Sequence, residues 1–326
     1  MGKKVWTARL LCWGAAILSL CLGAVGLSPG ELLRAIAGGP RDTAGYIFWY
    51  VRLPRTLGCL LSGGALAVSG AVIQGVLHNK LASPSIIGVN AGAGLAVTVC
   101  CACGALSGWA IAGAAFGGAL ACVLLIVCMA EKVGASRTTV ILSGVAVNAF
   151  LNAMSEAVTT LVPEVGMMTA DFRVGGFSSV SYLRLIPAGV LIGIALLGVY
   201  SLHNELDVLA LGEETARGLG MDVKKVRTLL LVLAAMLAGC AVSFAGLLGF
   251  VGLIVPHAMR RVAGGESRWL LPMCALGGGA FVTACDTAAR VVFAPFELPV
   301  GILLSALGGP FFLLLLLKRK GGRADA

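Results

Sequence analysis

The sequence has little charge and no stretch typical of a soluble domain. Charged residues occupy 12% of the 326 positions, 59% are hydrophobic, and the mean hydropathy is +0.98. These values exclude an ordinary soluble globular protein and indicate a chain that crosses a membrane several times. The alternating ten-residue segments of a transmembrane β-barrel are absent from the sequence. Apolar runs of about 20 residues recur instead, each long enough to cross the bilayer as a helix.

The motifs of nucleotide binding and hydrolysis are also absent. The sequence has no Walker A string, dinucleotide fingerprint, nucleophile elbow or zinc-protease motif. We therefore predict a non-catalytic protein with no cofactor of its own. The 11 cysteines lack the paired spacing of a disulfide framework. Cys100, Cys101 and Cys103 form the densest group, but no nearby His or acid completes a ligand set, so we expect apolar side chains and no metal site.

The apolar runs predict an all-α polytopic membrane protein with about ten transmembrane helices in one domain, residues 1–326. The first run resembles a signal peptide, but no convincing cleavage site follows it, so we expect it to be retained. Residues 250–263 form the weakest span; they contain Gly252 and Pro256, and we expect them to be partly extended and buried in protein. The predicted spans are 8–27, 56–77, 86–106, 109–130, 139–162, 183–202, 228–248, 250–263, 270–292 and 298–317.

The basic residues predict the orientation of these spans. In the ten-span arrangement, 17 of the 24 Lys and Arg residues lie at inside ends and seven at outside ends. Because positive charge is retained in the cytoplasm, both termini are expected there. The net charge of +9 is thus attributed to topology in a lipid bilayer, and no nucleic-acid partner is expected.

Short motifs occur along the apolar runs in a fixed order. They are Arg-Leu-Pro-Arg at 52–55, His-Asn-Lys-Leu-Ala at 78–82, Ile-Gly-Val-Asn-Ala-Gly at 87–92, Leu-Ser-Gly-Val-Ala at 142–146, the Gly-punctuated stretch at 211–220, Gly-Phe-Val-Gly-Leu-Ile-Val-Pro-His at 249–257, Glu-Leu-Pro-Val-Gly at 297–301 and Leu-Gly-Gly-Pro at 307–310. Together they resemble the FecCD family, the permease subunits of ABC importers for ferric siderophores, haem and cobalamin. The resemblance covers about residues 45–317. Lys80 departs from it, because the family commonly has Pro at this position.

The resemblance implies the architecture of a type II ABC importer permease in the bacterial cell membrane. It implies a second permease copy or close paralogue and two ATPase subunits on the cytoplasmic face, which bind the ATP and Mg. It also implies a solute-binding protein on the outer face. An ion-coupled secondary transporter or channel is the alternative. That alternative requires ionisable residues within the membrane, and only Glu156 and Asp286 are candidates.

Three outer arginines are candidates for docking the binding protein. Arg52 and Arg55 flank Pro54, and Arg290 lies at the outer end of the ninth span. The guanidinium group pairs bidentately with carboxylates, so these residues predict a cationic docking patch. Two alternatives remain open: all three anchor at the membrane interface as snorkelling cations, or Arg290 pairs with Asp286 one helical turn away.

The polar residues 205–227, which we name the coupling segment, are the candidate ATPase contact. We expect two short helical pieces, with Gly218 in a turn that requires positive φ. A solvated loop is the alternative. It would leave five apolar side chains exposed without a partner, namely Leu206, Val208, Leu209, Leu211 and Leu219. The residues expected to take part in coupling are Leu211, Gly212, Glu213, Glu214, Arg217, Gly218 and Gly220.

Two further groups are candidates for the gate and the pathway. By resemblance, the gate candidates lie at the cytoplasmic end of the pathway: Asn79, Leu81, Ser136, Thr138 and Thr139. The pathway candidates Asn148, Asn152 and Glu156 share one helical stripe because they are spaced four residues apart. Ordinary hydrogen bonding between helices is the alternative for both groups.

Overall fold

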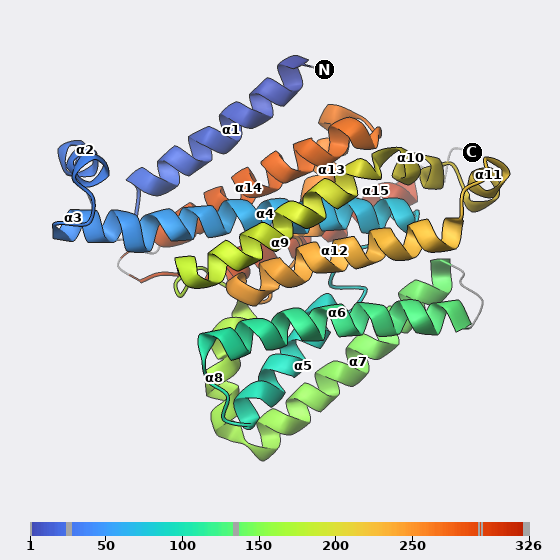
Figure 1. Ribbon diagram of the computed structural model, residues 1–326, viewed down its shortest axis with the longest axis horizontal. Helices are drawn as coiled ribbons and strands as arrows, with labels where there is room; N and C mark the ends of the chain where they lie inside the picture. Colours follow the sequence, from blue (N-terminus) through green and yellow to red (C-terminus); the bar gives the residue numbers. More distant parts are fainter. Residues whose placement is uncertain (1, 24–27, 133–136, 293, 295, 322–326) are drawn as a thin grey trace.

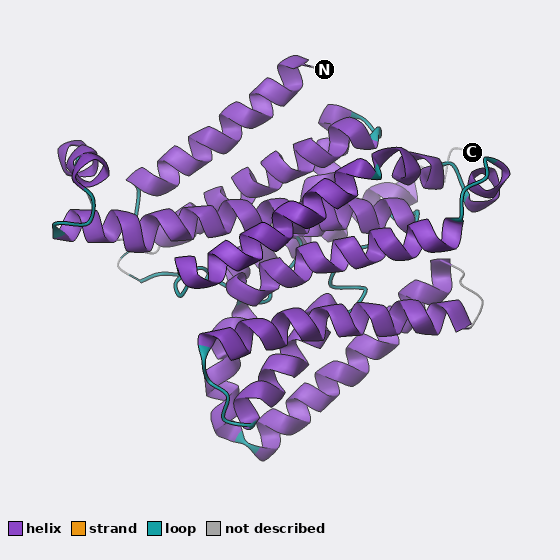
Figure 2. Ribbon diagram, viewed as in Figure 1, coloured by secondary structure: helices purple, strands orange, loops and turns teal. Residues whose placement is uncertain are grey.

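The computed structural model describes residues 2–23, 28–132, 137–292, 294 and 296–321, and no strand occurs within these ranges (Figure 2). The helices in chain order are α1 (Gly2–Cys21), α2 (Pro29–Gly38), α3 (Thr43–Tyr46), the π-helix η1 (Ile47–Arg52), α4 (Leu53–Val76), α5 (Val89–Ala102), α6 (Gly108–Lys132), α7 (Arg137–Leu161), α8 (Pro163–Val174), α9 (Tyr182–Ser201), α10 (His203–Ala210), α11 (Glu213–Gly218), α12 (Val223–Ala245), α13 (Val251–Ala263), α14 (Ser267–Val292) and α15 (Val300–Gly321).

Each of the ten predicted spans coincides with a helix, which confirms the all-α polytopic architecture. Within the described residues, five continuous helical segments are long and apolar enough to cross a bilayer: 43–76, 108–129, 182–201, 223–245 and 267–292. Three shorter apolar helices cover 6–21, 89–102 and 300–315. Positions 24–27 of the first predicted span lie outside the described residues.

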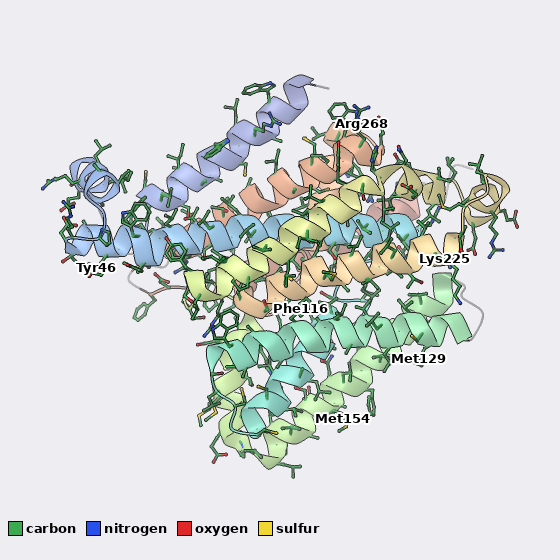
Figure 3. All side chains as sticks on the ribbon, viewed as in Figure 1. Tyr46, Phe116, Met129, Met154, Lys225 and Arg268 are labelled. Carbon is green, nitrogen blue, oxygen red and sulfur yellow. The ribbon has the colours of Figure 1, made fainter. Side chains whose placement is uncertain are left out.

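The helices form an elongated bundle whose two ends differ (Figure 1). Helices α5, α6, α7 and α8 lie together on one side, and α6 packs against α12 of the main group. Helices α2 and α3 lie at one end, with α10 and α11 at the other. The labelled side chains of Tyr46 and Lys225 mark these two ends in Figure 3.

Helix α4 lies at the centre of the main group and is buried along most of its length. It packs most extensively against α14, and Gly63 and Gly278 meet at that contact. A Cβ atom on either glycine would overlap the carbonyl oxygen of the other. The two backbones therefore touch directly, which is how small residues promote helix packing in lipid.

Residues 251–263 are a regular helix, α13, so the prediction of a partly extended segment is wrong. Pro256 lacks the N–H group that would bond to the Gly252 carbonyl four residues earlier. The side chain of Gln74 on α4 donates to that carbonyl instead, with Nε2 3.1 Å from the oxygen. Because the orphaned carbonyl gains a donor from another helix, the buried turn tolerates proline.

Candidate functional site

The arginine cluster (Arg52, Arg55 and Arg290) lies inside the bundle at the end that carries α2 and α3. Their exposed fractions are 3%, 6% and 3%, respectively. The three residues come from η1, the first turn of α4 and the last turn of α14. Burial of three cations requires partners within the protein, because an unpaired buried charge is costly.

Arg55 is paired on both sides of its guanidinium group. Its Nε lies 3.0 Å from Asp286 Oδ2 and its Nη2 lies 2.9 Å from Asp286 Oδ1, so the pairing is bidentate. Its Nη1 donates to Glu297 Oε2 at 2.6 Å. Asp286 is fully buried, whereas the Glu297 side chain is 38% exposed. Arg55 thus has one inaccessible carboxylate partner and one that reaches the surface.

The other two arginines tie α1 to this centre. Arg290 forms an ion pair with Asp286, with Nε 3.0 Å from Oδ2, but the geometry is not that of a hydrogen bond. The Nη2 of Arg290 donates a hydrogen bond to Ser19 Oγ of α1 at 2.8 Å. Arg52 Nη1 donates to the carbonyl oxygens of two residues at the end of α1, at 2.7 and 2.8 Å. Cations are favourable there because a helix C-terminus has unpaired carbonyls and partial negative charge. The cluster therefore joins α1, α4 and α14.

This geometry corrects part of the sequence interpretation. The arginines do not form a freely exposed patch, because Asp286 draws Arg55 and Arg290 inward as its counterions. The alternative pairing of Arg290 with Asp286 is present. The docking role of the three arginines stays a prediction.

The coupling segment contains two short helices, α10 and α11, as expected. Glu213 fastens α11 to the bundle: its Oε2 accepts from Arg227 of α12 and its Oε1 from Arg217, each at 2.7 Å. Within α11, Ala216 is fully buried, whereas Glu214 is exposed. At the start of α12, the hydrogen bond from Lys225 lowers the pKa of the capping carboxyl of Asp222.

The positive φ expected at Gly218 occurs at two other glycines of this segment. Gly212 and Gly220 have positive φ, +123° and +82°. Gly218 instead ends α11 in ordinary helical conformation, with open space where a Cβ would lie. The expectation of a positive φ at Gly218 is therefore wrong, because the chain leaves the helix two residues later.

The apolar side chains of the segment also divide into two sets. Leu206 and Leu209 are buried, and Leu206 packs over Gly75 of α4, so these two have their partner within the chain. They share the face of the amphipathic helix α10 that lies on the bundle. Leu211 and Leu219, which flank α11, are 68% and 67% exposed.

The gate candidates Asn79 and Leu81 lie in the turn after α4. Asn79 Oδ1 accepts from the Leu81 backbone N–H at 3.0 Å, and both residues line a cavity of about 650 Å³. Ser136 lies outside the described residues. Thr138 and Thr139 belong to the first turn of α7, where only the backbone is described.

The predicted stripe on α7 is divided. Asn148 Nδ2 donates to the carbonyl oxygens of Ser85 and Ile86 in the turn before α5, at 2.9 and 3.1 Å, so this residue makes a structural hydrogen bond. Asn152 and Glu156 are exposed in the chain. Within the described residues, no three His, Cys, Asp or Glu side chains are grouped to hold a metal ion.

Comparison with known proteins decides the family. The model of the FecCD transport family matches residues 11–318. The chain belongs to this family. The vitamin B12 import system permease protein BtuC of Salmonella typhimurium (strain LT2) is 37% identical over 319 residues, 95% of this chain and 93% of that protein; the Salmonella typhi protein matches equally.

Solved structures agree with this assignment. A protein described as a metal-chelate type ABC transporter, in an inward-facing conformation, matches this FecCD chain with a TM-score of 0.87 and 28% identity, covering 98% of this chain and all of that one. PsaBC from Streptococcus pneumoniae matches with a TM-score of 0.58 at 18% identity, covering 83% and 92%, which shows the fold alone. The protein is the membrane permease subunit of an ABC importer.

Two residues of this FecCD permease that form polar contacts between distant segments were not among the residues predicted from the sequence. Glu297 belongs to the Glu-Leu-Pro-Val-Gly motif, but nothing local predicts that it reaches Arg55. Gln74, one of few polar residues in a long apolar run, bonds both Gly252 and Arg260 of α13. An isolated amide within a span is the signal that could have identified it, since such groups seek partners in lipid.

Proposed function

We propose that this permease imports a metal chelate or a corrinoid, as one of two permease subunits that share two ATPases and one solute-binding protein. ATP would be hydrolysed on the separate ATPases, and both termini would lie in the cytoplasm. The observation that carries the cargo class is the 37% identity, over nearly the full length, to permeases named for vitamin B12 import. The metal-chelate type transporter of similar fold supports the wider class.

For coupling, we propose that the ATPase contacts the exposed face of α11. Leu211 and Leu219 are large apolar side chains left in the open beside the exposed Glu214. Exposed apolar groups rimmed by polar ones are typical of a protein contact. Glu213 and its bonds to Arg217 and Arg227 would hold α11 at a fixed orientation for this contact.

Helix α14 is the proposed link between coupling and docking. At one end, Asp207 of α10 accepts from the backbone N–H of Ser267, at 2.9 Å, and so caps α14. At the other end, Asp286 and Arg290 belong to the arginine cluster. The 26-residue helix extends about 39 Å. If α14 moves as a rigid body, a movement of α10 would displace the arginine cluster, where the binding protein is proposed to dock.

For docking, we propose an exchange of carboxylates on Arg55. Glu297 is the partner of Arg55 that reaches the surface, whereas Asp286 is fully buried. A carboxylate of the binding protein would replace Glu297 at Nη1, while Asp286 would keep its bidentate contact. Glu297→Gln should therefore strengthen docking, because a weaker competitor leaves Nη1 available. Unchanged affinity and salt dependence in this variant would argue against the exchange.

The gate is proposed to open by alternating access between two states that ATP binding biases. Asn79 and Leu81 are the proposed gate residues with Ser136, Thr138 and Thr139, and Asn152 and Glu156 the proposed pathway residues on α7. Asn148, which bonds to the segment before α5, would then hold the wall of the pathway.

The deciding experiment is uptake by the reconstituted complex. The permease, its ATPase and its binding protein are placed in liposomes, and uptake of cobalamin, a ferric siderophore and haem is measured with ATP inside. ATP-dependent uptake of one of these is the expected result. Uptake by the permease alone, driven by a proton gradient without ATP, would instead support the secondary transporter.

A further inference from the structure

A cavity of about 190 Å³ lies beside the arginine cluster, between the start of α4, helix α8, the start of α9 and the end of α12. Arg55 and Glu297, which form an ion pair with each other, both line it. A further cation, Arg184, lines the same cavity. The carboxylate that the binding protein is proposed to displace therefore shares one open space with a cation outside the arginine cluster.

Arg184 occupies a position that is unfavourable for a cation. It belongs to the first turn of α9, and its guanidinium group lies against Gly108, the first residue of α6, where a Cβ atom would overlap it. The N-terminus of a helix carries partial positive charge, and neither of these first turns contains an acid that would offset it. The guanidinium group therefore lies near the positive ends of two helices.

No partner within the chain compensates this charge. Among the residues that the structure describes, no Asp or Glu forms an ion pair with Arg184, and none accepts a hydrogen bond from its guanidinium group. Asp171 also lines the cavity, but its side chain is exposed and is not paired with Arg184. Because Arg184 is half-buried, water solvates it only in part, and a carboxylate that reaches it would be stabilised.

We propose that Arg184 receives the carboxylate of Glu297 when the binding protein docks. This carboxylate transfer rests on the exchange at Arg55 proposed above. Glu297 lies in the connection between α14 and α15, and its side chain is 38% exposed, so it can change rotamer without disturbing a packed helix. Since Glu297 and Arg184 line the same cavity, the carboxylate would move through open space.

The transfer makes docking more favourable because it adds an ion pair. Before docking, Arg55 is paired with Glu297 and Arg184 is unpaired. After docking, the carboxylate of the binding protein would be paired with Arg55, and Glu297 with Arg184. Without Arg184, the displaced carboxylate would instead be left unpaired beside the acid Asp171. Arg184 is thus a positioning residue that need not touch the binding protein.

The test is a double-mutant cycle on the affinity of the solute-binding protein for the complete transporter in nanodiscs. Arg184→Gln should weaken docking about threefold to fivefold, as expected for a partly exposed ion pair. The same change should have no effect in the Glu297→Gln background, which has no carboxylate to transfer. Arg184→Lys should restore most of the affinity, and high salt should reduce the effect of Arg184→Gln. Arg184 has no partner to lose, so its variants should fold.

Arg41→Gln is the matched control, because it removes an exposed cation that does not line the cavity. Its effect on docking, if any, should be the same in both backgrounds. Equal weakening by Arg184→Gln in both backgrounds would identify a direct contact with the binding protein and overturn the transfer, as would unchanged docking in both. If Glu297→Gln itself fails to strengthen docking, the exchange at Arg55 is refuted and the transfer with it.

Discussion

Asp286 should be the residue whose loss destabilises this permease most through charge alone. Asp286→Asn preserves size but removes the carboxylate that two buried arginines share. Arg55 would keep only Glu297, which contacts a single nitrogen, and Arg290 would keep only neutral partners such as Ser19. Removing one partner of a buried ion pair costs roughly 3–5 kcal/mol, because the remaining charge is left uncompensated.

The measurement is the apparent Tm of the purified permease in detergent, together with its expression level. A loss of this size should lower the Tm by an amount on the order of 10 °C. Asp171→Asn is the matched control. Asp171 is exposed and forms no ion pair with any residue that the structure describes, so this change should alter stability by less than about 0.5 kcal/mol. The double variant Asp286→Asn, Arg290→Gln should cost less than the sum of the two single changes.

Two outcomes would refute this reasoning. If Asp286→Asn and Asp171→Asn melt together near the wild type, the buried arginines do not depend on the shared carboxylate. If the double variant shows simple additivity, Asp286 and Arg290 are not coupled, and their 3.0 Å separation has no energetic consequence.

Three other changes test the remaining conclusions. Gly220→Val should uncouple ATP hydrolysis from uptake, because a β-branched residue at φ +82° costs roughly 1–2 kcal/mol. The control Gly218→Val, at a helical position with open space for a side chain, should transport normally. Equal uptake by the two variants would show that the turn at Gly220 takes no part in coupling. In a cysteine-depleted background, Thr215→Cys should resist an impermeant thiol reagent on intact cells and Asp42→Cys should react, and outside labelling at 215 would reverse the proposed topology. Gly63→Ala should reduce stability by roughly 1–3 kcal/mol and so lower the Tm, because the added methyl group has no room beside α14. An unchanged Tm would show that α4 and α14 separate easily.

Local properties of the sequence were enough to predict the ten apolar spans, although α2, α3, η1 and α8 lie outside them. Hydropathy and run length depend only on neighbouring residues, and every predicted span coincides with a helix. The coupling segment was recognised for the same reason, because its charges and glycines interrupt an otherwise apolar chain. The family motifs, which are short and ordered along the chain, identified a FecCD permease.

The failures concern residues whose state depends on a distant partner. A positive φ was assigned to Gly218 from composition, but the left-handed turn lies at Gly220, two residues after α11 ends. The sequence showed that Leu206 and Leu209 need an apolar partner but did not identify it, and the face of α10 that carries them lies on α4. A one-dimensional pattern states that a helix is amphipathic but not which surface it meets.

The sequence alone therefore determined the membrane class, the order of the spans and the family of this protein, since these follow from local hydropathy and contiguous motifs. Tertiary structure alone decided what the buried polar groups do. Arg55 meets Asp286 across 231 residues of sequence, and Gln74 supplies a donor to the carbonyl freed by Pro256 across 178. Inside a bilayer no water can satisfy such groups, so their partners are chosen by how the helices are rotated and packed together.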